Sequence, residues 1–269
     1  MNNLIQKYEE LLTYLRSLGS LAVAFSGGVD STFLLFAARE ALGDRALAIT
    51  ASINSVPRHE LKEAEEFCKA MNITQLVEIY DELSIEGFSQ NPPDRCYICK
   101  HRLFTNMLSL AKQHGIEALA EGSNLDDEGD YRPGLRAIAE LGILSPLRIC
   151  GFSKADIRAL SKEFRLPTWD KPSYACLSSR FVYGETITKE KLFMVEQAEE
   201  YLRSLGFSQH RVRIHGNLAR IELMPADFPK MSDEDLRRDI HTRLKALGFS
   251  YVSLDLIGYR TGSMNEVLK

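Results

Sequence analysis

Short apolar segments alternate with amphipathic segments through residues 1–166, and this alternation constrains the fold more than any other feature. The apolar segments have the length of buried strands, whereas the segments between them repeat apolar residues at helical spacing. Strands that alternate with helices build a parallel sheet, because each helix carries the chain back across one face of that sheet. We therefore predict an α/β domain in which helices cover both faces of a parallel sheet.

Two further regions follow this domain in the sequence. Residues 167–185 are rich in Pro, Ser and Tyr and show little periodicity, so we predict an interdomain loop. Residues 186–269 have patterns in the order α-β-β-α-β, which predicts a small α+β domain. The predicted strands span residues 21–25, 46–51, 75–80, 117–121, 143–147, 211–214, 219–223 and 251–256, and the predicted helices span 4–18, 31–42, 58–71, 103–114, 154–164, 188–205 and 233–247.

A glycine-rich turn joins the first predicted strand to the helix that follows it. Its residues are Ser26, Gly27, Gly28, Val29, Asp30 and Ser31. Two glycines let the backbone turn tightly against an anion, and the start of the helix adds unpaired N–H groups and a positive dipole end. The two serines can donate hydroxyl groups, and Asp30, a candidate catalytic residue, can hold Mg²⁺ or polarise the loop. The turn therefore predicts a phosphate-binding loop beyond the carboxyl end of a strand.

The signatures of two other nucleotide-binding loops are missing from the sequence. Neither G-x-x-x-x-G-K-[ST], typical of phosphoryl-transferring P-loops, nor the dinucleotide pattern G-x-G-x-x-G follows this strand. The string S-G-G-x-D-S instead resembles the PP-loop of the ATP pyrophosphatase superfamily. That resemblance implies cleavage of ATP between the α- and β-phosphates, transfer of AMP to a carboxylate or carbonyl oxygen, and retention of pyrophosphate in the loop.

A second polar loop, residues 121–127, follows the strand predicted at 117–121. The carboxyl ends of parallel strands lie at one edge of a sheet. Asn124 and Asp127 would therefore face the same rim as the first loop and could reach the nucleotide or its metal. An acidic loop that contains a glycine fits an ordinary turn equally well, and both interpretations stay open at this point.

Charge and composition indicate which classes of binding partner, nucleic acid or membrane, this protein is expected to have. The net charge is −4 at pH 7, so a broad basic surface for nucleic acid is not expected. Residues 203–220 gather Arg and His, a pattern that fits either a solvated strand edge or a phosphate-binding patch. We find no secretory pattern, no apolar stretch of membrane-spanning length and an odd count of five cysteines. These features predict a cytoplasmic protein with reduced thiols and no membrane partner.

Three of the cysteines lie in segments that we expect to be accessible. Cys96 and Cys99 form a C-x-x-C in a predicted loop, and Cys176 lies beside two serines and an arginine that favours a thiolate. Three thiolates can hold a [4Fe–4S] cluster and leave one iron for sulfide, whereas zinc would need a fourth ligand. Cys176 could also act alone as the sulfur donor. We expect Cys68 and Cys150 to be buried packing residues.

Several segments together resemble the LarE-type sulfur transferases, and the resemblance covers essentially the whole chain. They are the turn at 26–31, residues 121–134, residues 169–180, the pair Arg211 and Arg213, and residues 258–265. The resemblance implies ATP-dependent adenylation of a carboxylate of pyridinium-3,5-biscarboxylic acid mononucleotide, followed by its conversion to a thiocarboxylate. This product belongs to the nickel-pincer cofactor of lactate racemase. The family tends to assemble, so the resemblance also implies a homo-oligomer.

The same resemblance implies how sulfur is supplied. Cys176 is either sacrificed and becomes dehydroalanine, or it joins Cys96 and Cys99 in holding a [4Fe–4S] cluster that delivers sulfur repeatedly. The C-x-x-C matches the second branch of the family, so our hypothesis is the cluster form, reloaded by sulfide or another sulfur donor.

The resemblance further assigns residues to the phosphate of the nucleotide substrate. These residues are Ser179, Arg180, Arg211 and Arg213, with Glu199 and Glu222 as possible helpers. Arginine suits a phosphate monoester because its planar fork donates paired hydrogen bonds. Either glutamate could equally be a surface charge.

Two other functions compete with this prediction. A tRNA-thiolating enzyme also combines a PP-loop, a C-x-x-C and a distant cysteine, but it would favour a basic surface, and Val29 differs from the lysine often seen inside that loop. A non-catalytic iron–sulfur or nucleotide-binding sensor would bind ATP without ever releasing pyrophosphate. Amidotransferase-type synthetases need a glutaminase or an ammonia channel, and no such domain is recognisable.

Overall fold

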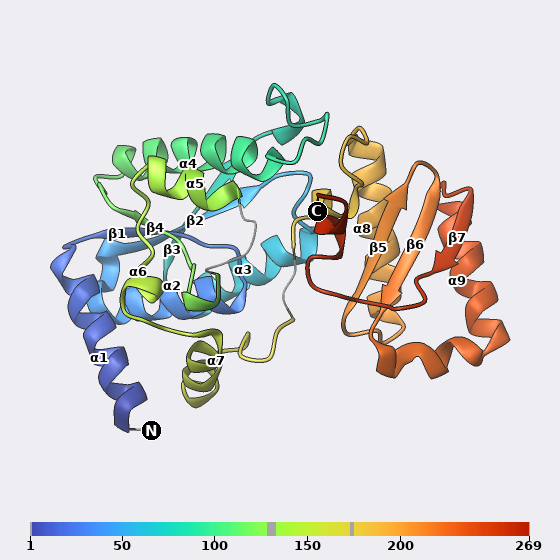
Figure 1. Ribbon diagram of the computed structural model, residues 1–269. Coiled ribbons are helices and arrows are strands. Elements are labelled where there is room, and N and C mark those ends of the chain that lie inside the picture. The colour runs from blue at the N-terminus through green and yellow to red at the C-terminus, as the bar shows by residue number, and fades with distance from the viewer. Residues whose placement is uncertain (1, 128–132, 173–174, 269) are drawn as a thin grey trace. The chain divides into compact units, whose positions relative to one another are not determined.

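A parallel sheet forms the centre of the first of two units, which comprises residues 1–81 and 96–174 (Figure 1). The computed structural model describes residues 2–127, 133–172 and 175–268. The sheet contains β1 (Leu21–Ala24), β2 (Ala46–Ser52), β3 (Thr74–Ile79) and β4 (Leu119–Ala120), in the order β3-β2-β1-β4 with parallel pairing throughout. The predicted α/β fold class is confirmed.

Helices cover both faces of this sheet (Figure 1). They are α1 (Asn2–Ser17), α2 (Val29–Leu42), α3 (Arg58–Ala70), α4 (Arg95–Gln113), α5 (Pro133–Glu140), α6 (Pro146–Ile149) and α7 (Lys154–Glu163). Because side chains alternate along a strand, Leu21 and Val23 of β1 join a core with α1, α2, α3 and α7, whereas Ala22 joins a second core with α4 and α5. Two buried faces explain why β1 and β2 are mostly apolar, whereas the edge strand β3 is half-exposed and carries polar residues.

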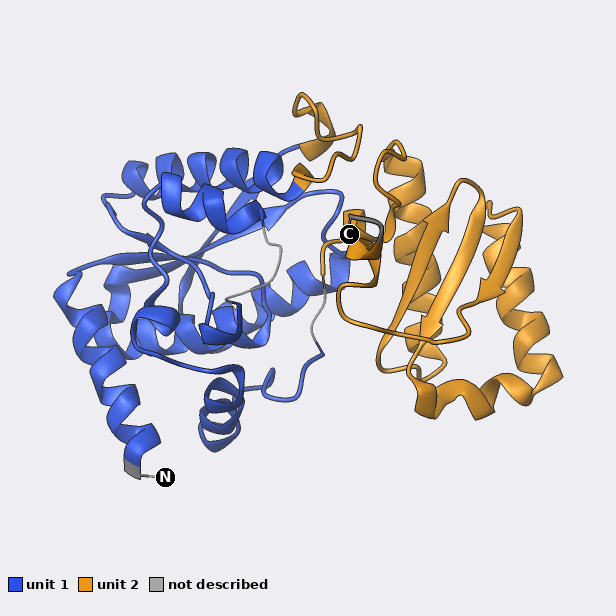
Figure 2. Cartoon of the chain, in the orientation of Figure 1, with its two compact units in different colours: residues 1–81, 96–174 blue, residues 82–95, 175–269 orange. Residues whose placement is uncertain are grey.

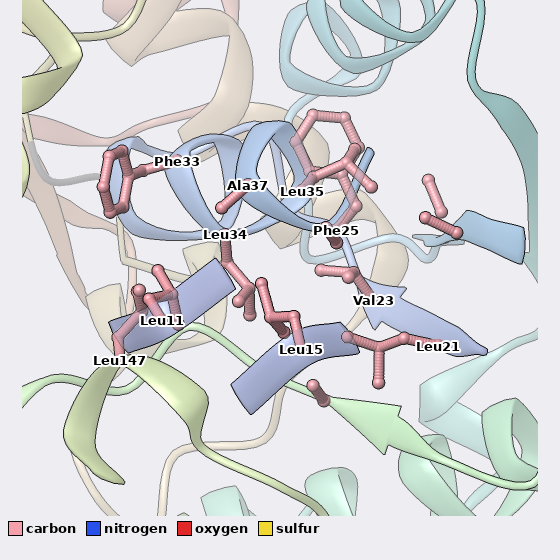
Figure 3. Packing of buried hydrophobic residues seen from close by; sticks show 14 of the residues in the cluster. Leu11, Leu15, Leu21, Val23, Phe25, Phe33, Leu34, Leu35, Ala37 and Leu147 are labelled. Atoms are coloured by element: carbon pink, nitrogen blue, oxygen red, sulfur yellow. The ribbon is translucent and has the colours of Figure 1, made fainter. Parts of the chain in front are cut away.

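Helix α2 contacts both β1 and α1 in the first core. Figure 3 shows Leu34 extending from α2 toward Leu11 and Leu15 of α1, while Leu21 and Val23 lie on the adjacent strand. These five side chains are all fully buried. The helix that begins at the glycine-rich turn is therefore held in place by fully buried side chains.

The second unit comprises residues 82–95 and 175–269 (Figure 2). Its sheet has the order β5-β6-β7, in which β5 (His210–His215) pairs antiparallel with β6 (Leu218–Leu223), and β7 (Tyr251–Leu254) pairs parallel with β6. Helices α8 (Lys189–Ser204) and α9 (Glu234–Ala246) pack against β5 and β7 and against each other. This is the predicted order α-β-β-α-β. The domain limits at residues 166 and 185 stay a prediction.

Three local predictions were wrong. Helix α4 begins at Arg95 instead of residue 103, so the C-x-x-C lies in a helix and not in a loop. The preceding Pro-Pro-Asp is typical of a helix start and indicates the earlier boundary. The strand predicted at 143–147 reduces to one bridge between Leu144 and Ala120, because Ser145 and Pro146 start helix α6. Helix α5 was not predicted, since its pattern is short.

In the part of the chain that the structure describes, no helix is long and apolar enough to cross a membrane.

Truncation of Leu34 tests the importance of the α1–α2 core. Leu34→Ala removes a fully buried side chain and leaves a cavity, so we expect the free energy of unfolding to fall by about 3 kcal/mol. Ile149→Ala, at a side chain with 56% exposure in the same unit, should cost less than about 1 kcal/mol. Urea titrations of both variants measure the difference, and equal losses would contradict the assignment of this core.

Candidate active site

Two loops meet where the strand order reverses. Strand β1 has β2 on one side and β4 on the other, and ligands of open α/β sheets bind beyond the carboxyl ends of strands at such a point. The glycine-rich turn follows β1, and residues 121–127 follow β4. A Cβ added to Gly122 would lie 2.9 Å from the backbone nitrogen of Ser31, so only glycine allows this close approach.

The glycine-rich turn is fixed by its own serines. The hydroxyl oxygens of Ser26 and Ser31 are 3.0 Å apart, and the Ser31 hydroxyl donates to the carbonyl of Gly28 at 3.2 Å. Gly27 has a φ of +69°, a conformation that favours glycine, and Gly28 is the N-cap of α2. Val29 is buried in the core below. The turn thus presents the start of a helix, where the first N–H groups lack helical partners and favour anions.

Asp30 is the meeting point of three elements. Its Oδ1 accepts a hydrogen bond from Asn124 Nδ2 at 3.3 Å, and its Oδ2 accepts one from Lys154 Nζ at 2.5 Å. Asp127 accepts from the backbone N–H of Asn124 at 3.0 Å and so fixes the turn that presents the amide. The structure therefore brings Asp30 and Asn124 together as expected for a shared rim. It also adds Lys154, which sequence analysis assigned only to the start of a helix.

Lys171 is a second lysine that sequence analysis missed. Its Nζ donates to the carbonyl of Gly27 at 3.0 Å and to the carboxylates of Glu60 and Glu63 at 2.7 Å each. Burial alone would lower the pKa of Lys171, but the two carboxylates raise it above its ordinary value. Burial alone would raise the pKa of Glu60, but His59, whose Nε2 lies 3.6 Å from Oε1, and the hydrogen bond and charge of Lys171 lower it. Lys171 thereby holds the glycine-rich turn against α3.

The five cysteines differ in accessibility. Cys96 is exposed and Cys99 partly exposed, and because they are three residues apart on α4 they share a face of that helix. Cys176 is also exposed. Cys68 is buried as expected, and burial raises the pKa of its thiol to about 12. Cys150 is only partly buried, because it follows the short helix α6 and not a strand as predicted.

A buried arginine holds the backbone around Cys176. The Nη1 of Arg180 donates to the carbonyl of Ala175 at 2.9 Å and to that of Cys176 at 3.3 Å. The same guanidinium forms paired hydrogen bonds of 2.8 and 2.7 Å with Glu199. Burial alone would raise the pKa of Glu199, but the charge and hydrogen bonds of Arg180 lower it. Glu199 is thus a buried counter-ion and not a surface charge.

The other residues assigned to the substrate phosphate lie in the same unit. Arg213 forms hydrogen bonds of 3.1 and 2.9 Å with Glu222 and donates to the carbonyl of Ser179 at 2.9 Å. Arg211 lies two residues earlier on β5, and its guanidinium lies 5.1 Å from the ring centre of Tyr259. Burial, with the nearby charge of another arginine, lowers the pKa of Arg211 to about 10. All three arginines are therefore buried, and Glu222 is the buried carboxylate that pairs with Arg213.

Known proteins are similar to this chain over its whole length. An uncharacterized protein of Synechocystis is 42% identical over 262 residues, which cover 97% of this chain and 98% of that protein. The pyridinium-3,5-bisthiocarboxylic acid mononucleotide synthase of Lactiplantibacillus plantarum is 40% identical over 278 residues, covering 100% of this chain and 97% of the synthase. The chain belongs to this synthase family, the LarE-type sulfur transferases.

More distant similarity places the family in a superfamily. A chain of the glutamine-hydrolyzing GMP synthase of Thermoplasma volcanium is 30% identical over 192 residues, which cover 65% of this chain and 60% of that one. This supports the PP-loop superfamily expected from the glycine-rich turn. The chain is therefore an enzyme of the ATP-dependent sulfurtransferase class. No protein-family model matches the chain.

Removal of the Lys171 ammonium tests its hold on the turn. Lys171→Met leaves the buried Glu60 without this partner, so we expect a loss of about 2 kcal/mol in the free energy of unfolding at pH 7. Because the folded pKa of Glu60 is lowered, its stabilising contribution is present above about pH 4.3 and is lost as pH falls through the folded pKa. The difference between wild type and variant should shrink over that range.

Urea titrations at several pH values measure this difference. Lys62→Met is the matched control, because Lys62 is an exposed lysine of α3 that pairs with an exposed glutamate. A control that loses as much stability as Lys171→Met, or a difference that does not change with pH, would contradict the buried pair.

Proposed function

We propose that this protein uses ATP to adenylate a carboxylate of pyridinium-3,5-biscarboxylic acid mononucleotide and then converts that carboxylate to a thiocarboxylate. The similarity to the synthase of L. plantarum over essentially the full length of both chains carries the proposal. The glycine-rich turn with its polar neighbours supports the use of ATP. The exposed thiols support the transfer of sulfur.

The first step is attack of the substrate carboxylate on the α-phosphorus of ATP. A P–O bond forms to the carboxylate and the bond between the α-phosphorus and the bridging oxygen breaks, so pyrophosphate leaves with the electron pair. The turn from Ser26 to Ser31 would hold this pyrophosphate through hydroxyls and helix amides. Asp30 and Asn124 offer oxygen ligands that fit Mg²⁺, which would neutralise charge on the phosphates. Lys154, which donates to Asp30, would add a positive charge beside the same phosphates.

The second unit would hold the phosphate of the nucleotide substrate. We assign that role to Ser179, Arg180, Arg211 and Arg213. The three arginines are accompanied by two glutamates, of which Glu199 pairs with Arg180 and Glu222 with Arg213. This set of five side chains therefore carries a net positive charge, which favours an anion with oxygen acceptors.

Sulfur then replaces AMP on the activated carbonyl. If Cys176 is the donor, its thiolate attacks the carbonyl carbon, and AMP leaves with the electron pair of the broken C–O bond. Removal of the Cys176 α-proton and cleavage of its Cβ–Sγ bond then leave a thiocarboxylate on the substrate and dehydroalanine in the chain. In this form each protein molecule is consumed by its reaction.

We favour a form in which Cys176 is preserved. A [4Fe–4S] cluster held by Cys96, Cys99 and Cys176 would supply sulfide at its fourth iron. The donor set fits, because all three thiols are exposed or partly exposed and two share one face of α4. Among the described residues no group of three metal-binding side chains is already gathered, so assembly of the thiols is part of the proposal. Sulfide or another sulfur donor would reload the cluster.

Reduced thiols suit a cytoplasmic location, which we also propose. A homo-oligomer stays a prediction from the family resemblance. Neither a nucleic-acid partner nor a membrane partner is part of the proposal, given the net charge of −4.

Pyrophosphate release tests the adenylation step. Wild-type protein with ATP, Mg²⁺ and the biscarboxylic acid mononucleotide should release pyrophosphate, and Asp30→Asn should lower the rate about 100-fold because the carboxylate that would hold Mg²⁺ and that pairs with Lys154 is lost. Asp44→Asn, at an exposed carboxylate after the same helix, is the matched control and should keep the wild-type rate. ATP binding without pyrophosphate release would favour a sensor and contradict the proposal.

Iron analysis decides between the two sulfur sources. Wild-type protein prepared without oxygen should contain about four iron atoms and four acid-labile sulfides per chain, and Cys96→Ala/Cys99→Ala protein should contain neither. Wild-type protein without iron, even after reconstitution, would eliminate the cluster form. Mass spectrometry should then show the loss of one H₂S equivalent from Cys176 per turnover.

A further inference from the structure

A second buried arginine holds the turn that carries Cys176. Arg95 has only 4% exposure, and its Nη1 donates to the carbonyl of Ser178 at 2.9 Å. Arg180 holds the carbonyls of Ala175 and Cys176 in the same turn. The backbone on both sides of the Cys176 thiol is therefore fixed by guanidinium groups, while the thiol itself is exposed.

The segment that ends at Arg95 is fastened to the same unit along its length. Asn91 is fully buried, its Nδ2 donates to the carbonyl of Val182 at 2.7 Å, and its side-chain oxygen accepts from Arg95. Its backbone carbonyl accepts from Gly184 N–H at 3.0 Å, and Ser89 accepts from Ile187 N–H at 2.8 Å. Asn91 also has a φ of +54°, which is uncommon for a residue other than glycine and persists where the surroundings enforce it.

The hydrogen bond from Arg95 to the Ser178 carbonyl is important because of where the two residues lie in the sequence. Arg95 is bonded to Cys96, the first residue of the C-x-x-C, and Ser178 is two residues after Cys176. The hydrogen bond between Arg95 and Ser178 thus joins two stretches of chain that each carry an accessible thiol. Burying a guanidinium group is costly unless it is well hydrogen-bonded, and an apolar residue could anchor the segment at lower cost.

We propose that Arg95 is a positioning residue for sulfur delivery, which fixes the chain next to Cys96 to the turn of Cys176. Its role is to raise the effective concentration of the Cys96 thiol at Cys176 and to leave both thiols exposed. The positioning role rests on the proposed function in one respect, namely that sulfur delivery uses Cys96 and Cys176 together. The contact between Arg95 and Ser178 is present in the free protein, before ATP, substrate or metal binds.

Disulfide trapping in metal-free protein tests the proposal directly. In a Cys99→Ser parent, diamide takes two electrons and two protons from a pair of thiols, and digestion with mass spectrometry measures the Cys96–Cys176 disulfide. We expect Arg95→Met to lower the rate of its formation about tenfold, whereas Arg95→Lys, which still donates a hydrogen bond, keeps most of it. Arg102→Met, at an exposed arginine of the same helix, is the matched control and should not change the rate.

Several results would overturn the proposal. They are an unchanged rate in Arg95→Met, an equal loss in Arg102→Met, and a parent that forms no Cys96–Cys176 disulfide at all. If Arg95→Met does not fold, Arg95→Gln replaces it, and a loss of about threefold is expected because a neutral donor remains. Thermal unfolding of each variant shows whether the rate follows the loss of this contact or a general loss of structure.

Iron content separates this proposal from the proposed function. Arg95→Met retains all three cysteines, so lower iron in this variant together with a slower disulfide supports the positioning role. Wild-type protein without iron would eliminate the cluster but leave the disulfide measurement intact. Normal iron content and a normal disulfide rate in Arg95→Met would eliminate the positioning role alone.

Discussion

The placement of β1 between β2 and β4 is the constraint on which the candidate active site depends. Parallel pairing on both sides sends the chain out of β1 and β4 at the same edge, and the two following loops must share that space. The absence of a side chain at Gly122 lets them meet, since a Cβ there would press against the Ser31 nitrogen. The contact between Asp30 and Asn124 is a consequence of this topology.

Buried cationic side chains fix the loop segments that have no strand pairing to fix them. Lys171 fastens the glycine-rich turn to α3, and Arg180 and Arg95 fasten the turn of Cys176. Each cation donates to backbone carbonyls as well as to side chains, so each fixes the path of the chain and not only a charge. Such contacts are costly to bury and valuable where a loop must keep one conformation.

The sequence predicts the parts of this arrangement that depend on local pattern. Apolar periodicity located the strands and most helices, and the S-G-G-V-D-S string located the loop at Asp30, because both signals lie within a few neighbouring residues. The roles of Lys154 and Lys171 could not be found in this way. Each reaches the loop across more than a hundred residues of chain, and a single lysine in a helix start or a proline-rich segment has no local signature.

The distinction between local signals and long-range contacts also explains which features of the cysteine sites the sequence predicts. Their identity and spacing pointed to sulfur chemistry, but the sequence placed Cys96 and Cys99 in a loop, whereas a helix that starts at Arg95 presents them one turn apart. A helix fixes the separation of two thiols, and buried arginines fix the backbone beside the third. Thiols that transfer sulfur must be exposed to react, so their geometry has to be set by neighbours that are buried. The exposed thiol of Cys176 between Ala175 and Ser178, both held through their carbonyls, satisfies both requirements.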